Sequence, residues 1–199
     1  MSPDDHNDIA ALIGSRICHD LVNPVGAIGN GVELLGLAGT ASEELALIAD
    51  SVAQAQARIS LFRLAFGAAS PEVRVAGHEV AAILAAPDPG GKLQVTCALP
   101  DELPRPEAKL AALLVMCCQS AMPRGGKISL QAAQGAWEIE ANATVLRADT
   151  PPWQALAAGR AMPRLTPAQV HFALVGPVLQ ETGRQLRPAS GDGWLRLSF

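Results

Sequence analysis

The chain has 199 residues, a formal net charge of −4, 49% hydrophobic residues and 17% charged residues. This length allows one large domain or two small ones, and a composition this apolar can bury a core, which excludes a disordered chain. Because the net charge is negative and no dense run of Lys and Arg occurs, a nucleic-acid partner is not expected.

Nothing in the sequence predicts contact with a membrane. The N-terminus is acidic and polar, without the basic and apolar regions of a secretory signal. The longest apolar run, Leu110 to Cys118, is too short to span a bilayer. We therefore expect a cytoplasmic protein.

The first segment, from about Asp8 to Gly67, is predicted to be wholly helical. In its second half, apolar residues recur at spacings of three and four, as in an a/d seam of packed helices. These residues are Leu45, Ile48, Val52, Ala55, Ile59, Phe62 and Phe66. Thr40, followed by Glu43, predicts a capping box at the start of this helix.

The first half of this segment has a looser apolar stripe. It consists of Ile13, Ile17, Leu21, Pro24, Ile28 and Leu35. Gly36 and Gly39 are expected in a short connection, which predicts an antiparallel helical hairpin. Two helices cannot cover both apolar faces, so we predict that a second copy completes a dimeric four-helix bundle.

The second segment, from residue 70, alternates helical and strand patterns and predicts an α+β fold. Expected helices are Gly77–Ala86, Pro106–Met122 and one that opens at Thr166-Pro167. Expected strands are Lys92–Leu99, Lys127–Ala132, Trp137–Ala143 and Trp194–Phe199. Turns are expected at residues 87–91 and 123–126, which are rich in Pro and Gly.

Four cysteines occur, Cys18, Cys97, Cys117 and Cys118, and none forms a C-x-x-C pair. Neither a zinc site nor a disulfide framework is expected from such spacing. We expect the four residues to be small buried side chains.

The stretch that carries chemistry runs from His19 to Pro24 and reads HDLVNP. At about 100° per residue on a helix, Ile17, Leu21 and Ile28 lie roughly 160–200° from His19. His19 therefore points away from the core, on a stripe of small and polar residues. Such a histidine suits a reaction in which a second protein must come close.

Neutral imidazole is a good nucleophile near neutral pH, and attack on a phosphoryl group gives phosphohistidine. The adjacent carboxylate of Asp20 could hold the tautomer of His19, although neighbours on a helix diverge and contact would require favourable rotamers. Asn23, on the same face as His19, could bond to the phosphoryl group or to an incoming water. Pro24 cannot donate to the carbonyl of Asp20, so a kink after the histidine is plausible.

From His19 to Pro24 the sequence resembles the H-box of sensor histidine kinases, and nearly the whole chain resembles the ChpT-type histidine phosphotransferases. The resemblance implies a dimerisation and phosphotransfer hairpin over residues 1–69. A degenerate Bergerat/GHKL-like α/β sandwich, a relative of the kinase ATP-binding domain, would follow over residues 70–199. Residues Leu113 to Ile128 resemble the residue pattern of a kinase N-box helix and the Pro-x-Gly-Gly turn that follows it.

The sequence departs from the kinase pattern where a kinase binds ATP. Cys117 stands where kinases have a metal-binding Asn, and NATVLRADTPPW follows the strand at Trp137–Ala143 in place of an Asp-x-Gly-x-Gly box. We expect neither a bound cofactor or metal nor autokinase activity.

The family implies a two-way relay through His19. A receiver domain of a hybrid histidine kinase would donate the phosphoryl group, and response regulators of the CtrA type would accept it. Magnesium would be bound by the receiver. By resemblance, receivers would dock around His19 and contact Ser15, Arg16, Asn23, Gly26 and Asn30.

Two other functions remain open. A dimeric module could bind receivers without carrying phosphate, in which case changing His19 would leave function intact. A metal-dependent phosphohydrolase could use the His19–Asp20 pair, but it would need further ligands, and neither His78 nor His171 has acidic neighbours at ligand spacing. His171 is expected to be a packed helix residue. A phosphatase side activity through Asn23 is compatible with the main interpretation.

Overall fold

We describe a computed structural model of the chain, which covers residues 3–38, 43–86 and 90–199. The chain divides into two compact units, residues 1–63 and 64–199. The sequence placed this boundary after residue 69. Leu64 and Ala65 are buried, and the ammonium group of Lys109 donates to the carbonyl of Gly67 at 2.9 Å. These contacts join the last turn of the second helix to the second unit.

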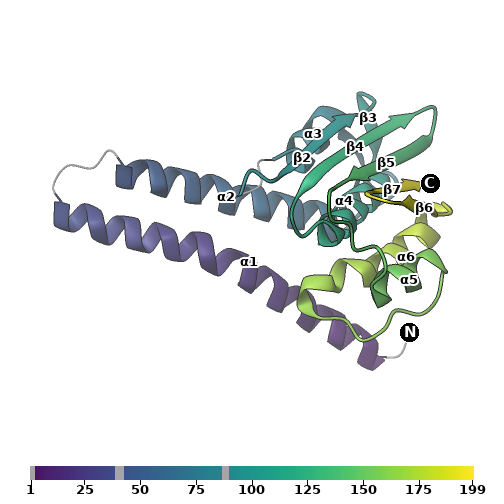
Figure 1. Cartoon of the computed structure of the whole chain (residues 1–199), viewed down its shortest axis with the longest axis horizontal. Helices are drawn as coiled ribbons and strands as arrows, with labels where there is room; N and C mark the ends of the chain where they lie inside the picture. The colour runs from purple at the N-terminus through teal and green to yellow at the C-terminus, as the bar shows by residue number, and fades with distance from the viewer. Residues whose placement is uncertain (1–2, 39–42, 87–89) are drawn as a thin grey trace. The chain divides into compact units, whose positions relative to one another are not determined.

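The first unit consists of two long helices, α1 (Pro3–Ala38) and α2 (Glu43–Phe66), which run antiparallel beside each other (Figure 1). Helix α1 begins five residues earlier than expected at Asp8 and continues through Gly36, which the sequence placed in the connection. A glycine costs about 1 kcal/mol relative to alanine within a helix, which a helix this long tolerates. Thr40 and Gly39 lie outside the described residues.

The apolar seam of α2 separates into two rows. Leu45, Val52 and Ile59, seven residues apart, are exposed. Ile48 and Ala55 are half-buried. Only part of the apolar surface of α2 is therefore covered within one copy of the chain, while a second row faces outward.

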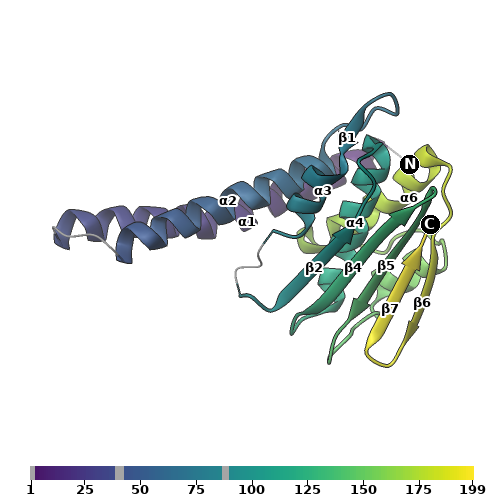
Figure 2. The same cartoon turned by 90° about the horizontal axis from the view of Figure 1, so that it is seen from above.

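The second unit contains a five-stranded mixed sheet with its helices on one face (Figure 2). The strand order is β2 (Leu93–Ala98), β4 (Gly126–Ala133), β5 (Ala136–Asn142), β7 (Trp194–Ser198) and β6 (Arg187–Gly191). β2 pairs with β4 in parallel, and the other pairs are antiparallel. A parallel pair needs a crossover, which here contains α4 (Arg105–Ala121).

Helix α4 forms the centre of the core, because twelve of its 17 residues are buried. Its neighbour is α6 (Val170–Thr182), which follows a short 3-10 turn, Pro167–Gln169. The expected helix start at Thr166 is thus an N-cap of that turn, where Thr166 and Gln169 make the reciprocal bonds of a capping box. The predicted α+β fold is confirmed.

Four short elements were not expected from the sequence. α5 (Pro151–Ala157) begins with two prolines. β6 contains Pro188, Ala189 and Gly191, which are all residues of low strand propensity. β1 (Arg74–Ala76) and β3 (Glu102–Pro104) form a separate antiparallel pair. Between them lies α3 (Gly77–Leu84), two residues shorter than predicted.

The turn before β4 requires glycine at two positions. Gly125 and Gly126 have φ of 80° and 151°. A Cβ at Gly125 would collide with the backbone of Lys92, and one at Gly126 with the carbonyl of Asn142. The amide of Gly126 donates to Lys92 at 2.9 Å. The turn therefore sets the register of β4 against β2.

Candidate functional site

His19 lies in the middle of α1 and is turned toward solvent. Its side chain is 79% exposed, whereas Ile17 and Leu21, two residues before and after it, are half-buried. An unbroken helix on both sides gives the imidazole a rigid base. The outward orientation predicted from the helical angle is thus what the structure shows.

The carboxylate of Asp20 contacts the ring of its neighbour. Asp20 Oδ1 lies 3.1 Å from His19 Nδ1, so the rotamers needed for contact between adjacent helix residues are adopted. The second oxygen, Asp20 Oδ2, accepts a hydrogen bond from Arg16 Nε at 2.9 Å. Arg16 and Asp20 side chains are 19% and 12% exposed, far less than that of His19.

This arrangement selects one form of the neutral imidazole. A carboxylate can only accept, so the neutral ring bonds to Asp20 with its proton on Nδ1. Nε2 then carries the free lone pair and faces outward with the exposed ring. The site offers a nucleophilic nitrogen to a partner, and Asp20 is placed to offset positive charge that develops on the ring.

Most of the residues predicted to contact receivers share the face of His19. Ser15 and Asn23 lie four residues before and after His19, Gly26 lies seven residues after it and Asn30 eleven, and all four are exposed. A Cβ at Gly26 would meet nothing within 4 Å, so packing within the chain does not require a glycine there. The surface next to the imidazole therefore has no large side chain at position 26.

Arg16 differs from these residues. It is half-buried and pairs with Asp20 one turn away, rather than projecting from the open face. Sequence reasoning assigned it only to the docking surface and missed this pair. The signal was available, since opposite charges four residues apart on a helix are a recognised pairing pattern.

Pro24 is buried in the turn that follows His19, and α1 continues through it. Proline has no backbone N–H, so the carbonyl of Asp20 loses its usual helical donor at this position. His19 and the missing helical hydrogen bond are therefore within one and a half turns of each other.

The cysteines differ in burial, and one differs from the prediction. Cys117 and Cys118 are fully buried and Cys97 is half-buried, but Cys18 is exposed. Cys18 lies seven residues before the exposed Val25, on a row that the chain itself does not cover. Burial raises the pKa of Cys97 to about 11 and of Cys118 to about 12, and it raises that of Cys117 well above its usual value. These three thiols are therefore protonated near neutral pH.

The second unit is closely packed around Cys117. Cys117, which the sequence resemblance aligned with a kinase metal-binding Asn, has no exposed surface. Trp153 of α5 is 2% exposed and lies edge-on against Phe172 of α6, with ring centroids 5.4 Å apart. A thiol buried in an apolar helix is a poor ligand for Mg²⁺, which prefers oxygen.

A metal-dependent reaction would require several ligand side chains gathered around one point. Across the part of the chain that the structure describes, no group of three or more His, Cys, Asp or Glu is placed to hold a metal. His171 is 2% exposed, and the centroid of its ring lies 4.8 Å from the ring centroid of Phe172, as expected for a packed helix residue.

Among the described helices, none has both the length and the apolar character that crossing a bilayer demands.

The second unit matches a known family. The family model for the histidine phosphotransferase C-terminal domain matches residues 67–193. This match covers the second unit and does not include His19.

The chain is also similar to individual proteins. The protein phosphotransferase ChpT of Brucella abortus (strain 2308) is 36% identical over 126 residues, which are 62% of this chain and 60% of the relative. The match thus spans less than two thirds of that relative's length. A solved bacterial phosphotransferase structure aligns with 100% of this chain and 97% of its own, at 28% identity and a TM-score of 0.80. A histidine kinase domain from Erythrobacter litoralis aligns with 98% of this chain at 15% identity and a TM-score of 0.41.

Proposed function

Because the chain belongs to the ChpT-type histidine phosphotransferases, we propose that it carries a phosphoryl group on His19 and passes it between receiver domains of a bacterial phosphorelay. The family resemblance predicted from the sequence is confirmed by the match over residues 67–193. The observation that carries the proposal for His19 is its exposed ring, whose Nδ1 meets Asp20 and whose Nε2 faces outward.

The chemistry follows from this geometry. The lone pair of His19 Nε2 attacks the phosphorus of an aspartyl phosphate on the donor receiver. A P–N bond forms, the P–O bond to the aspartate breaks, and the carboxylate leaves with the electron pair. The ring becomes positively charged with its Nδ1 proton directed at Asp20, 3.1 Å away. Transfer to the second receiver is the reverse of this step, and catalysis is mainly positioning and charge stabilisation.

The donor in this proposal is the receiver of a hybrid histidine kinase, and the acceptors are response regulators of the CtrA type. Mg²⁺ is bound by the receiver, not by this chain. The docking face consists of Ser15, Asn23, Gly26 and Asn30, all exposed around His19. Small side chains there leave room for a folded partner to bring its aspartyl phosphate within reach of Nε2. The proposed location is the cytoplasm.

We further propose that the chain does not phosphorylate itself from ATP. The thiol of Cys117 replaces a metal-binding amide and is fully buried. The segment after β5 forms α5 and places Trp153 against α6, where a kinase carries a glycine-rich box. The phosphoryl group on His19 then has to come from another protein.

The active form in this proposal is a homodimer. In addition to the outward row on α2, Val25 and Val32 of α1 are exposed, seven residues apart. Two apolar rows with heptad spacing on one hairpin are typical of helices that pack against further helices. A second copy related by a two-fold axis would cover both rows and complete a four-helix bundle.

The test uses a receiver domain phosphorylated with radiolabel on its aspartate, mixed with the wild type and with His19→Ala. We expect acid-labile, base-stable label on the wild type and none on the variant. ATP alone should label neither protein. Receiver binding by both proteins, measured by calorimetry, controls for loss of docking in the variant.

The alternatives give different results. If the wild type binds receivers but takes no label, the protein is a receiver-binding module without phosphate chemistry. If free phosphate is released and His19→Ala releases it equally, the reaction is hydrolysis. An effect of Asn23→Ala on that release, with transfer intact, would identify a phosphatase side activity.

A further inference from the structure

The carboxylate of Asp20 is held by a contact to each oxygen. Oδ2 accepts from Arg16 Nε at 2.9 Å, and Oδ1 meets His19 Nδ1 at 3.1 Å. Adjacent side chains on a helix diverge, so an unrestrained Asp20 would spend much of its time away from the ring. The bond from Arg16 restricts rotation of the carboxylate and keeps its other oxygen near Nδ1.

Burial differs along this chain of contacts. Arg16 and Asp20 are 19% and 12% exposed, whereas His19 is 79% exposed. An imidazole this open is not oriented by packing, so its orientation depends on the polar contact at Nδ1. The Arg16–Asp20 pair is better packed than His19, so this pair can restrict the orientation of the His19 ring.

We propose that Arg16 is a positioning residue for phosphoryl transfer: it fixes Asp20, which keeps the neutral ring of His19 protonated on Nδ1 and its Nε2 available to phosphorus. Arg16 acts through Asp20 and does not touch the reacting atoms. This inference rests on the proposed function of His19. It differs from a docking role, in which Arg16 would contact the receiver directly.

The guanidinium group suits this role better than an ammonium group would. It is planar, remains charged at physiological pH and donates from a nitrogen whose direction is fixed by the side chain. A lysine at position 16 could keep the charge but not the direction of the Nε donor. Charge alone should therefore restore only part of the effect.

The first measurement is the tautomer of His19, read from the ring ¹⁵N chemical shifts of the full-length protein. In the wild type, the neutral ring should be mainly protonated on Nδ1. Arg16→Gln should shift the population toward the Nε2–H form and slow single-turnover transfer by about tenfold, as removal of an outer orienting partner does in other sites. Arg16→Lys should lie between the two.

Two controls separate positioning from other roles of Arg16. Arg74→Gln removes an arginine from another ion pair, with Glu102, and should leave the tautomer and the rate unchanged. Circular dichroism of each variant shows whether the helices are retained. In an Asp20→Asn background, Arg16→Gln should cause no further loss of rate, because its route of action is already removed.

Three results would overturn the inference: an unchanged tautomer in Arg16→Gln, a further rate loss in the Asp20→Asn background, or weaker receiver binding that accounts for the whole effect. The last result would instead place Arg16 on the docking surface. Each of these leaves the phosphohistidine itself intact. The proposed function fails separately, when His19→Ala still takes up label.

Discussion

Among single residues, the buried thiols give the chain a distinctive response to alkaline pH. The chain contains no tyrosine, so no phenol titrates in the same range. In the folded protein the pKa of Cys97 is raised to about 11 and that of Cys118 to about 12 by burial, against 9.0 for the ordinary thiol. Between these values the folded state holds protons that the unfolded state has lost.

We therefore expect the free energy of unfolding to fall as pH rises above about 9. The contribution of the thiols is fully present below pH 9 and is lost as pH approaches 11 to 12. Each thiol can add at most about 1.4 kcal/mol per pH unit to the slope. Urea unfolding at several pH values measures this, and Cys118→Ala should give a flatter curve. Parallel curves for both proteins would contradict the prediction.

At His19, part of the geometry could be predicted from the sequence and part could not. The exposure of His19 could be predicted because the helical angle places apolar neighbours on the opposite side. The contact with Asp20 could be named only as one that requires favourable rotamers, and the bond from Arg16 that accompanies it was not predicted. Cys18 shows the limit of composition: cysteine is usually buried, yet this one lies on a row that a single chain leaves open.

At the scale of one element, the proposed docking face of helix α1 carries no side chain at Gly26, so a single substitution there tests it. Gly26 lies two turns after His19, and a side chain there would extend into open space. Gly26→Leu should keep or slightly raise helix stability, because leucine is favoured over glycine by roughly 0.5–1 kcal/mol in a helix. The added bulk should weaken binding of a receiver by about tenfold or more, an effect of the size seen for central interface residues.

Isothermal titration of a receiver onto Gly26→Leu measures this loss. Gly176→Leu on α6 is the matched control, since that glycine is also helical and its Cβ position is also open. Binding should be unchanged there. Wild-type affinity in Gly26→Leu would show that receivers dock elsewhere.

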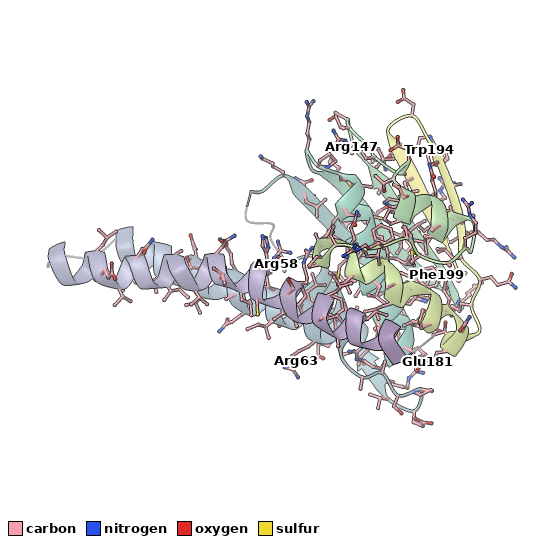
Figure 3. The ribbon with its side chains drawn as sticks, turned by 90° about the horizontal axis from the view of Figure 1, so that it is seen from below. Arg58, Arg63, Arg147, Glu181, Trp194 and Phe199 are labelled. Atoms are coloured by element: carbon pink, nitrogen blue, oxygen red, sulfur yellow. The ribbon has the colours of Figure 1, made fainter. Side chains whose placement is uncertain are left out.

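Elements of the second unit are joined by Glu107 at the start of α4. Its carboxylate accepts from Trp137 Nε1 of β5 at 2.8 Å and from Arg184 Nη2 at 2.6 Å. Arg184 also donates to the carbonyl of Gly135 at 2.6 Å. Phe199, labelled in Figure 3, stacks on Trp137 at 5.5 Å between ring centroids. One carboxylate thus connects the central helix, a central strand and Arg184, which lies two residues after the end of α6.

Replacing Glu107 by alanine should lower the free energy of unfolding by about 2 kcal/mol, because a part-buried indole N–H and a guanidinium both lose their acceptor. Urea unfolding at neutral pH measures the loss. Glu102→Ala is the control: its pair with Arg74 is exposed on both sides, and such pairs contribute about 0–1 kcal/mol. Equal losses in the two variants would show that Glu107 adds no more than a surface pair.

The predictability of the elements followed their regularity. The α4 helix and the β4–β5 pair have strong periodic patterns and were predicted to within a few residues. β6 was missed because Pro188 and Gly191 are unfavourable in strands, and it forms only as an edge partner of β7. α5 was missed because its two leading prolines read as a turn, although proline is favoured at the first helical positions.

For the whole molecule, the sequence predicted that both apolar faces of the hairpin are covered, and a single chain covers only one of them. The a/d seam of α2 implied neighbours on both sides, and the structure of a single copy covers one row only. The uncovered row, Leu45, Val52 and Ile59, is 56%, 37% and 44% exposed. Nothing in a seam pattern tells whether its partner belongs to the same chain, which is why the second copy remains a proposal.

The row itself supplies the last prediction. In an isologous dimer each position occurs twice around the two-fold axis, so Val52→Glu would bury two carboxylates next to apolar side chains. We expect this variant to sediment as a monomer at concentrations where the wild type is a dimer. Its Tm should be lower, because the outward row of α2 and the row of Val25 and Val32 on α1 become exposed to water. Ala53→Glu adds the same charge at an exposed position one residue later, about 100° around the helix, and should remain dimeric. Sedimentation of the wild type as a monomer at micromolar concentration would remove the basis for the bundle. Dissociation of both variants would mean that net charge, rather than the Val52 row, controls association.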